Sequence, residues 1–266
     1  GIIREINLLR QKLKVNTKVH ARFEITDTGA VPYLEALIRD GQVELFSIMD
    51  HSPGQGQFRD ILAYKRYYGQ VYAKSDPDMD VIIERKRKAK EQDTPGAIDH
   101  LVSVCRKHGI SVASHDDDSR AKIHWLKTLD IGVTEFPVNE EALAEAHDQG
   151  IQVCLGSPNV VRGKSQAANL SAREAISRGY GDILCSDYSP MTLLHAVFTL
   201  DRHGILPLHE AVRMVSLNPA RAVGIDRVTG SIEEGKTADL VLVDDSDAVP
   251  RVIRTWVAGQ EVYATC

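Results

Sequence analysis

Five apolar stretches of the sequence each end in a residue whose side chain can bind a metal ion or carry a proton. These terminal residues are Glu24, His51, His115, Glu135 and Asp187. Each stretch has the composition of a buried strand, and the chain turns away soon after it. In folds built on parallel strands the carboxyl ends meet at one rim, so we expect the five side chains to lie together.

Imidazoles and carboxylates packed at such a rim would be costly without a cation to neutralise them. A single histidine at a strand end is more often a satisfied core residue, and the prediction of a metal therefore depends on the convergence of several groups. The donor set suits zinc first, with manganese and iron(II) as alternatives and one or two ions bound. The predicted ligands are Glu24, His51, His115 and Asp187.

Neighbouring residues receive other roles. Asp116 directly follows His115 and is predicted to orient an imidazole, while Asp118 or Ser119 is predicted to cap the next helix. Glu135 is predicted to line the site without binding the metal.

Two loops near the expected rim offer groups that bind phosphate. Residues 52–57 supply backbone N–H groups and two amides, and residues 157–164 supply arginine and lysine with a helix start beyond them. A phosphorylated substrate is therefore favoured. The predicted substrate contacts are Gln55, Gln57, Glu135, Asn159, Arg162, Lys164 and Tyr188.

The segments that position these residues alternate between strand and helix patterns, which predicts an α/β fold with a parallel sheet. Asn139 and the sequence Ser171-x-x-Glu174 are typical helix N-terminal signals. Residues 58–94 are aromatic and then strongly charged, and we predict that they form helices over the mouth of the site. We predict that the basic run within them is a solvent-exposed helix face. The predicted strands cover residues 19–25, 45–51, 110–115, 131–136, 151–156 and 182–187.

Six such strands are two fewer than a closed (β/α)₈ barrel needs, so we expect roughly 100 further residues upstream of residue 1. Residues 1–222 are predicted to form an incomplete barrel domain. Residues 223–266 read as antiparallel strands of a small β-sandwich part.

The chain has 266 residues and a formal net charge of −5, so no general basic field would recruit nucleic acid or an anionic membrane. No apolar run approaches the roughly 18 residues of a membrane span. The four cysteines show no C-x-x-C spacing, which suits a cytoplasmic location. The expected partner is a small phosphorylated sugar, and the number of subunits is left open, with a homo-oligomer among the options.

The blocks FSIMDHSPGQGQF, VASHDDD, TEFP, SPNVVRG and ILCSDYSP, in this order, resemble the diphosphatases of bacterial phosphonate catabolism, a branch of the amidohydrolase superfamily. The resemblance implies a metal-dependent (β/α)₈ TIM-type barrel, of which this chain lacks the first two strands. It implies catalytic roles for Asp187, as the last-strand general acid/base, and for the fifth-strand His115. The implied reaction is hydrolysis of the α–β phosphoanhydride of a ribose 5-triphosphate, with release of diphosphate.

Two alternatives stay open at this point. The same barrel and metal could cleave a C–N bond, as a deaminase or cyclic amidase does. A chain without the front strands could also be a non-catalytic barrel subunit.

Overall fold

The computed structural model describes residues 1–56, 60–92, 94–164 and 170–265. The chain forms two compact units. One comprises residues Val19–Ile151, and the other comprises Gly1–Lys18 together with Gln152–Cys266. The predicted division between barrel and sandwich at residue 222 stays a prediction.

The Val19–Ile151 unit contains a parallel sheet whose strands pair in chain order. In its register Glu24 pairs with Met49, Met49 with His115, and His115 with Glu135. The carboxyl ends of these strands therefore form one row, as the sequence predicts for this part of the rim. The strands are β1 (His20–Glu24), β2 (Leu45–Met49), β3 (Ser111–His115) and β4 (Val133–Glu135).

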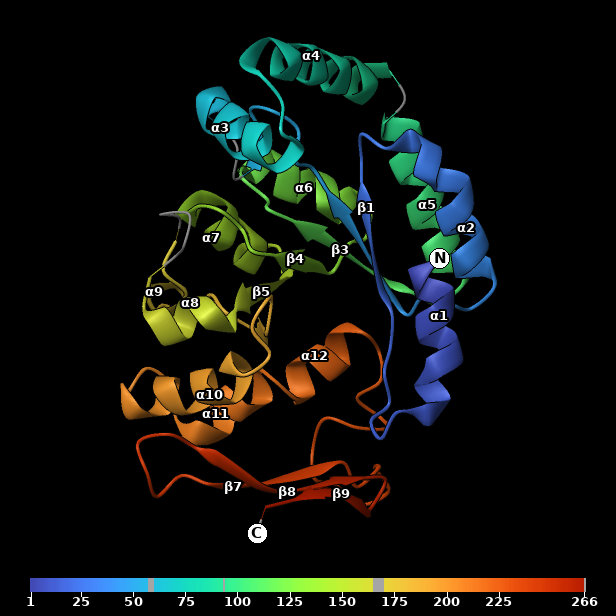
Figure 1. The fold of residues 1–266 in the computed structure, drawn as a ribbon. Helices are drawn as coiled ribbons and strands as arrows, with labels where there is room; N and C mark the ends of the chain where they lie inside the picture. The colour runs from blue at the N-terminus through green and yellow to red at the C-terminus, as the bar shows by residue number, and fades with distance from the viewer. Residues whose placement is uncertain (57–59, 93, 165–169, 266) are drawn as a thin grey trace. The chain divides into compact units, whose positions relative to one another are not determined.

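Helices follow these strands, and α2, α6 and α7 each bury apolar residues, among them Ile38, Ile123 and Leu143. Helices α2 and α5 pack side by side, as do α6 and α7 (Figure 1). Ser119 and Asn139 cap α6 and α7 by accepting hydrogen bonds from Lys122 N (3.4 Å) and Ala142 N (2.8 Å), which confirms both expected caps. The helices of this unit are η2 (Thr28–Ala30), α2 (Val31–Arg39), α3 (Ile61–Tyr72), α4 (Asp76–Gln92), α5 (Thr94–Lys107), α6 (Arg120–Thr128) and α7 (Glu140–Asp148).

The second unit pairs β5 with β6 in parallel and holds a separate antiparallel sheet of β7, β8 and β9. Together, the parallel strands and the antiparallel sheet among the described residues confirm the predicted α/β class and its small β part. Arg202 of α10 donates to the carbonyl oxygens of Asp245 (3.2 Å) and Asp247 (2.8 Å) and thereby holds the loop after β7.

The elements of the second unit have these bounds: α1 (Ile2–Leu9), η1 (Arg10–Lys12), β5 (Gln152–Gly156), α8 (Ser157–Arg162), α9 (Ala172–Ser177), β6 (Ile183–Cys185), α10 (Thr192–Arg202), α11 (Leu208–Arg213), α12 (Leu217–Ala222), β7 (Leu240–Asp244), β8 (Arg251–Val257) and β9 (Gln260–Ala264). Among the described helices, none combines the length and the hydropathy of a transmembrane span.

One local prediction in this unit is wrong, and a second is confirmed only in part, since Ser171 is the N-cap of α9. The segment after β5 is the helix α8 and not an open loop, because Pro158 suits a first helical turn. The Ser171 hydroxyl does not close a capping box at α9. Asn159 Oδ1 accepts the hydrogen bond from Ala172 N at 3.1 Å instead, and this bond satisfies the first helical N–H group.

Candidate active site

His51, His115 and Asp116 come together at the carboxyl ends of β2 and β3. One donor atom from each residue lies within 4.8 Å of the other two. His51 Nε2 is 3.6 Å from Asp116 Oδ2, and His115 Nδ1 is 3.2 Å from Asp116 Oδ1. His115 and Asp116 are buried and His51 is partly buried, so the three groups meet largely out of water.

The backbone reaches this arrangement through a tight turn at Asp116. Its φ is 54°, in the left-handed region that aspartate tolerates better than most residues. Gly56 lies close against this turn: a Cβ atom added to Gly56 would be 3.1 Å from Asp116 O. Gly56 N also donates to Asp118 Oδ2 at 3.0 Å. Only glycine allows this close approach without displacing the turn.

Glu24 holds His51 from the side opposite Asp116. Its Oε2 lies 2.9 Å from His51 Nδ1, and its Oε1 accepts the backbone N–H of His51 at 3.3 Å. A carboxylate on one ring nitrogen fixes the tautomer and leaves the other nitrogen for a ligand. Glu24, expected as a ligand itself, is therefore better suited to orienting His51.

Charge interactions in the group are strong. Burial raises the pKa of Asp116, but His115 and His51 outweigh it and lower that pKa to about 2. The carboxylates of Asp116 and Glu24 raise the pKa of His51 to about 9, against the opposing effect of burial. In the metal-free protein at neutral pH, His51 is therefore protonated between two carboxylates.

This raised pKa predicts a pH dependence of stability. The pKa of His51 in the folded protein, about 9, exceeds its ordinary value of 6.5. Protonated His51 therefore adds to the free energy of unfolding in full below pH 6.5, and this stabilisation is lost as the pH rises through 9. We expect His51→Gln in chelator-treated protein to remove on the order of 1–3 kcal/mol at pH 6 and almost nothing at pH 9.5. Denaturant unfolding of both proteins across this range measures the difference, and parallel pH profiles would contradict it.

The group also fits a divalent metal ion. His115 Nδ1 and Asp116 Oδ2 are buried without a hydrogen-bond partner among the described residues. Unsatisfied buried polar atoms are rare and need an explanation such as an absent ion. Two imidazoles and one carboxylate are a donor set typical of zinc, which keeps a further position open when it is catalytic. We therefore take these three residues as the candidate metal ligands.

Glu135 lines the same part of the rim without joining the group. Its Oε1 is 3.8 Å from His20 Nε2, and burial raises the pKa of its carboxyl. Burial, with Arg22 and His115 adding to it, lowers the pKa of His20 to about 4. His20 is therefore neutral at pH 7, and its Nε2 is 3.0 Å from Ser47 Oγ.

The loop after His51 is less open to phosphate than its sequence suggests. Its N–H groups at Ser52, Gln55 and Gly56 already bond to Asp50 Oδ1 (3.0 Å), Ser52 O (3.1 Å) and Asp118 Oδ2 (3.0 Å). The side chain of Gln55 stays a predicted substrate contact, and Gln57 lies outside the described residues.

The remaining predicted residues belong to the second unit. Asp187 is exposed just beyond β6, with a φ of 49°. Arg162, the last residue of α8, donates to the Tyr188 hydroxyl, and its guanidinium lies 6.0 Å from the tyrosine ring centroid. Lys164 is exposed just after α8. Asn159 uses its amide to join α8 to the start of α9, donating to Leu170 O at 3.0 Å, so we assign it a structural role.

Two ion pairs beside the group are absent from the sequence prediction. Lys90 Nζ lies 2.6 Å from Asp50 Oδ2, and Lys122 Nζ lies 3.0 Å from Asp117 Oδ1. Burial raises the pKa of Asp50, but the Lys90 ammonium contributes to a net lowering. Asp50 could be noticed in the sequence because it stands next to His51 at a strand end. No local pattern identifies Lys90, 40 residues away, as its partner.

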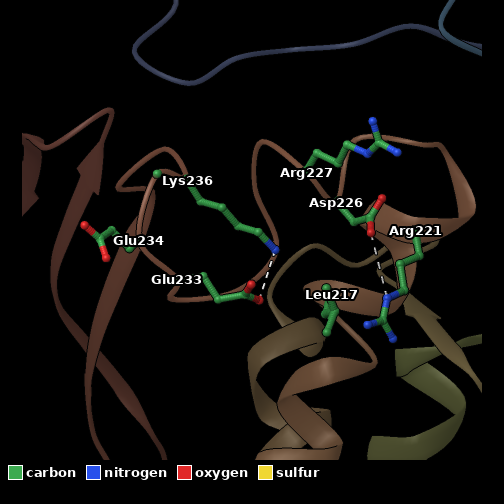
Figure 2. Close-up of a pocket in the computed structure, with 8 residues that line it drawn as sticks. Leu217, Arg221, Asp226, Arg227, Glu233, Glu234 and Lys236 are labelled. Atoms are coloured by element: carbon green, nitrogen blue, oxygen red, sulfur yellow. Dashed lines mark hydrogen bonds and ion pairs between the residues drawn. The ribbon is translucent and has the colours of Figure 1, made fainter.

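A polar pocket of about 430 Å³ lies elsewhere, within the second unit. Figure 2 shows two ion pairs among its charged side chains, Lys236 with Glu233 at 3.1 Å and Arg221 with Asp226 at 4.0 Å. None of its lining residues is a predicted site residue. The His51 group is therefore the stronger candidate for chemistry.

Known proteins resemble this chain in both sequence and fold. Residues 70–262 match the model of the amidohydrolase family. The chain is 36% identical over 259 residues to the alpha-D-ribose 1-methylphosphonate 5-triphosphate diphosphatase of Escherichia coli strain K12, covering 95% of this chain and 68% of that protein.

Solved structures give the same fold. The N-acetylglucosamine-6-phosphate deacetylase of Pasteurella multocida matches with a TM-score of 0.58 at 14% identity, over 99% of this chain and 80% of its own. A dihydropyrimidinase from Brevibacillus agri matches with a TM-score of 0.56 at 13% identity, over 99% of this chain and 73% of its own. At these identities the likeness concerns the fold alone.

Proposed function

Because this chain belongs to the amidohydrolase family, a family of hydrolases, we propose that it is a metal-dependent diphosphatase of phosphonate metabolism. The proposed substrate is α-D-ribose 1-methylphosphonate 5-triphosphate, the compound in the name of the Escherichia coli relative. Water cleaves the α–β phosphoanhydride bond, leaving a 5-phosphate on the sugar and releasing diphosphate. The observation that carries the proposal is the His51, His115 and Asp116 group in a chain so similar to a diphosphatase.

Each residue has a role in this proposal. His51, His115 and Asp116 would hold the ion, while Glu24 fixes the ring of His51. A divalent ion supplies a lowered pKa for water and positive charge beside the phosphoryl oxygens. Asp187 accepts the proton of the attacking water.

Arg162 and Lys164 bind phosphate oxygens in the same reaction. The Tyr188 hydroxyl accepts a hydrogen bond from Arg162 and so limits the orientations of its guanidinium. A guanidinium presents a fork of donors that matches two oxygens of one phosphate, whereas an ammonium is a single charged point.

A substrate panel tests the reaction class. The purified protein, loaded with zinc or manganese, is incubated with the ribose 5-triphosphate, an N-acetylated sugar phosphate and a dihydropyrimidine. We expect phosphorus NMR to show diphosphate from the first compound and no turnover of the others. Release of acetate or a ring-opened acid, without diphosphate, would favour the C–N hydrolase alternative and contradict the proposal.

Arg162→Lys tests the phosphate contacts. We expect the KM for the triphosphate to rise about 10-fold or more, because one charge-assisted bidentate contact is lost. The inhibition constant of the matching monophosphate should change by less than about 3-fold, since it offers fewer oxygens to bind. Steady-state kinetics measures both constants. Equal changes would show that Arg162 serves the fold through Tyr188.

A further inference from the structure

The helices α3 and α4 interrupt the alternation of strands and helices between β2 and β3. They pack on one another through a cluster of Tyr64, Met79 and Ile83, all buried. Tyr68 extends this cluster, with its ring centroid 4.6 Å from that of Tyr64. Because the two helices have an apolar core of their own, they can present side chains to the site without being part of the strand framework (Figure 1).

Two lysines of α4, Lys86 and Lys90, lie one turn apart and so share a face of the helix. Lys86 Nζ is 5.7 Å from the ring centroid of Tyr68 and 6.0 Å from that of Tyr64, so this face is directed to α3. Lys90 Nζ contacts Asp50 Oδ2 at 2.6 Å. Asp50 directly precedes His51, and helix α4 therefore delivers an ammonium group to the residue next to a candidate metal ligand.

Lys90 differs from the other cation at this end of β2. The Lys122 side chain is 18% exposed, and its ammonium contacts Asp117 Oδ1 at 3.0 Å and His115 O at 3.4 Å. The Lys90 side chain is 33% exposed, and its one salt bridge within the described part of the chain is to Asp50. Lys90 therefore keeps hydrogen-bond donors available for a ligand.

A polyphosphate substrate needs a cation at the ends of β1 to β3, because the negative charge of this region would otherwise repel it. Glu24, Asp50, Asp116 and Asp117 crowd the ends of β1 to β3, and their carboxylates would repel an anionic substrate. The neighbouring histidines and the ion offset part of this charge. A partly exposed ammonium held by Asp50, the residue before His51 in the sequence, is placed to receive a phosphate oxygen while it keeps its bond to Asp50.

We propose that Lys90 is a specificity residue that binds the phosphate chain of the substrate, with Asp50 holding its ammonium ready at the site. The proposal rests on the proposed function in naming a polyphosphate as the anion. It assigns to α3 and α4 the task of delivering this contact. It also gives the Val19–Ile151 unit a phosphate-binding group of its own.

The test measures the affinity of the purified protein for inorganic triphosphate by calorimetry, together with the KM for the ribose 5-triphosphate. Lys90→Gln is expected to weaken both by about 10-fold or more, the effect of losing one charge-assisted hydrogen bond. Lys90→Arg should stay within about 3-fold of the wild type, because it keeps the charge. Metal content and unfolding temperature are recorded for each variant so that folded, loaded proteins are compared.

Two further variants separate binding from a structural role. Lys88→Gln removes the same charge from the same helix at an exposed position, where Lys88 Nζ pairs with Glu84 at 3.6 Å, and should leave triphosphate affinity unchanged. Asp50→Asn removes the partner of Lys90 but leaves its ammonium in place. If Lys90 binds the anion, Asp50→Asn should lose much less triphosphate affinity than Lys90→Gln, because the amide oxygen can still accept a hydrogen bond from the ammonium. A purely structural ion pair would make both variants alike.

Equal triphosphate affinity in wild type and Lys90→Gln would overturn the proposal, as would equal losses in Lys90→Gln and Asp50→Asn, or no triphosphate binding by the wild type. Product analysis judges the proposed function separately. If diphosphate is released but triphosphate affinity does not depend on Lys90, only the role proposed for Lys90 is wrong. If triphosphate binding depends on Lys90 but no diphosphate is released, the proposed reaction is wrong and the binding role of Lys90 stands.

Discussion

Replacing His115 with glutamine is expected to abolish stoichiometric metal binding and to lower turnover by at least about 10³-fold. His115 is 8% exposed at the end of β3, and its Nδ1 has no hydrogen-bond partner among the described residues. Glutamine fills a similar volume but offers only weak oxygen and amide donors, so the two remaining residues would hold the ion poorly. Elemental analysis after dialysis, with turnover measured on the same sample, gives both quantities.

His124→Gln is the matched control. This histidine lies on α6, is 54% exposed and contacts Glu145 Oε1 at 2.5 Å. The same chemical change there should leave metal content and turnover at the wild-type level. Full metal occupancy in His115→Gln would show that the ion, if bound, is held elsewhere.

Asp187→Asn is expected to lower kcat by about 10²–10⁴-fold while the metal content stays unchanged. The amide keeps the shape of the side chain but has no basic oxygen to accept the proton of water. Asparagine also tolerates the left-handed backbone at this position, where φ is 49°, so the turn after β6 should persist. Steady-state kinetics and elemental analysis together measure the effect.

A rescue experiment sharpens this prediction. If the lost group is a base, small exogenous bases such as acetate or azide should restore part of the kcat of Asp187→Asn and not that of His115→Gln. Wild-type turnover in Asp187→Asn would remove this carboxylate from the mechanism.

Much of the strand framework could be predicted from the sequence because it depends on local patterns. Apolar runs that stop at Glu24, His51 and His115 mark strand ends, and parallel pairing then brings neighbouring ends together in one row. The helix caps at Ser119 and Asn139 are equally local, since each side chain bonds to an N–H group three residues on.

The parts that could not be predicted depend on contacts across many residues or on backbone angles. The sequence predicts that Asp116 meets one imidazole, but the left-handed turn that brings it near both His115 and His51 cannot be read from an aspartate in a run of three. Lys90 meets Asp50 only because α3 and α4 fold back over the end of β2. Ser171 is the N-cap of α9, but its hydroxyl makes no cap hydrogen bond and donates instead to Gly163 O at 3.5 Å, eight residues back in the sequence.

The central claim is tested most directly by hydrolysis of the ribose 5-triphosphate in ¹⁸O-labelled water, followed by phosphorus NMR of the products. Attack at the α-phosphorus predicts one ¹⁸O atom in the sugar 5-phosphate and unlabelled diphosphate, with turnover that disappears when the metal is removed by a chelator. Label in the diphosphate, stepwise release of single phosphates, or unchanged turnover in chelator would contradict a metal-dependent diphosphatase.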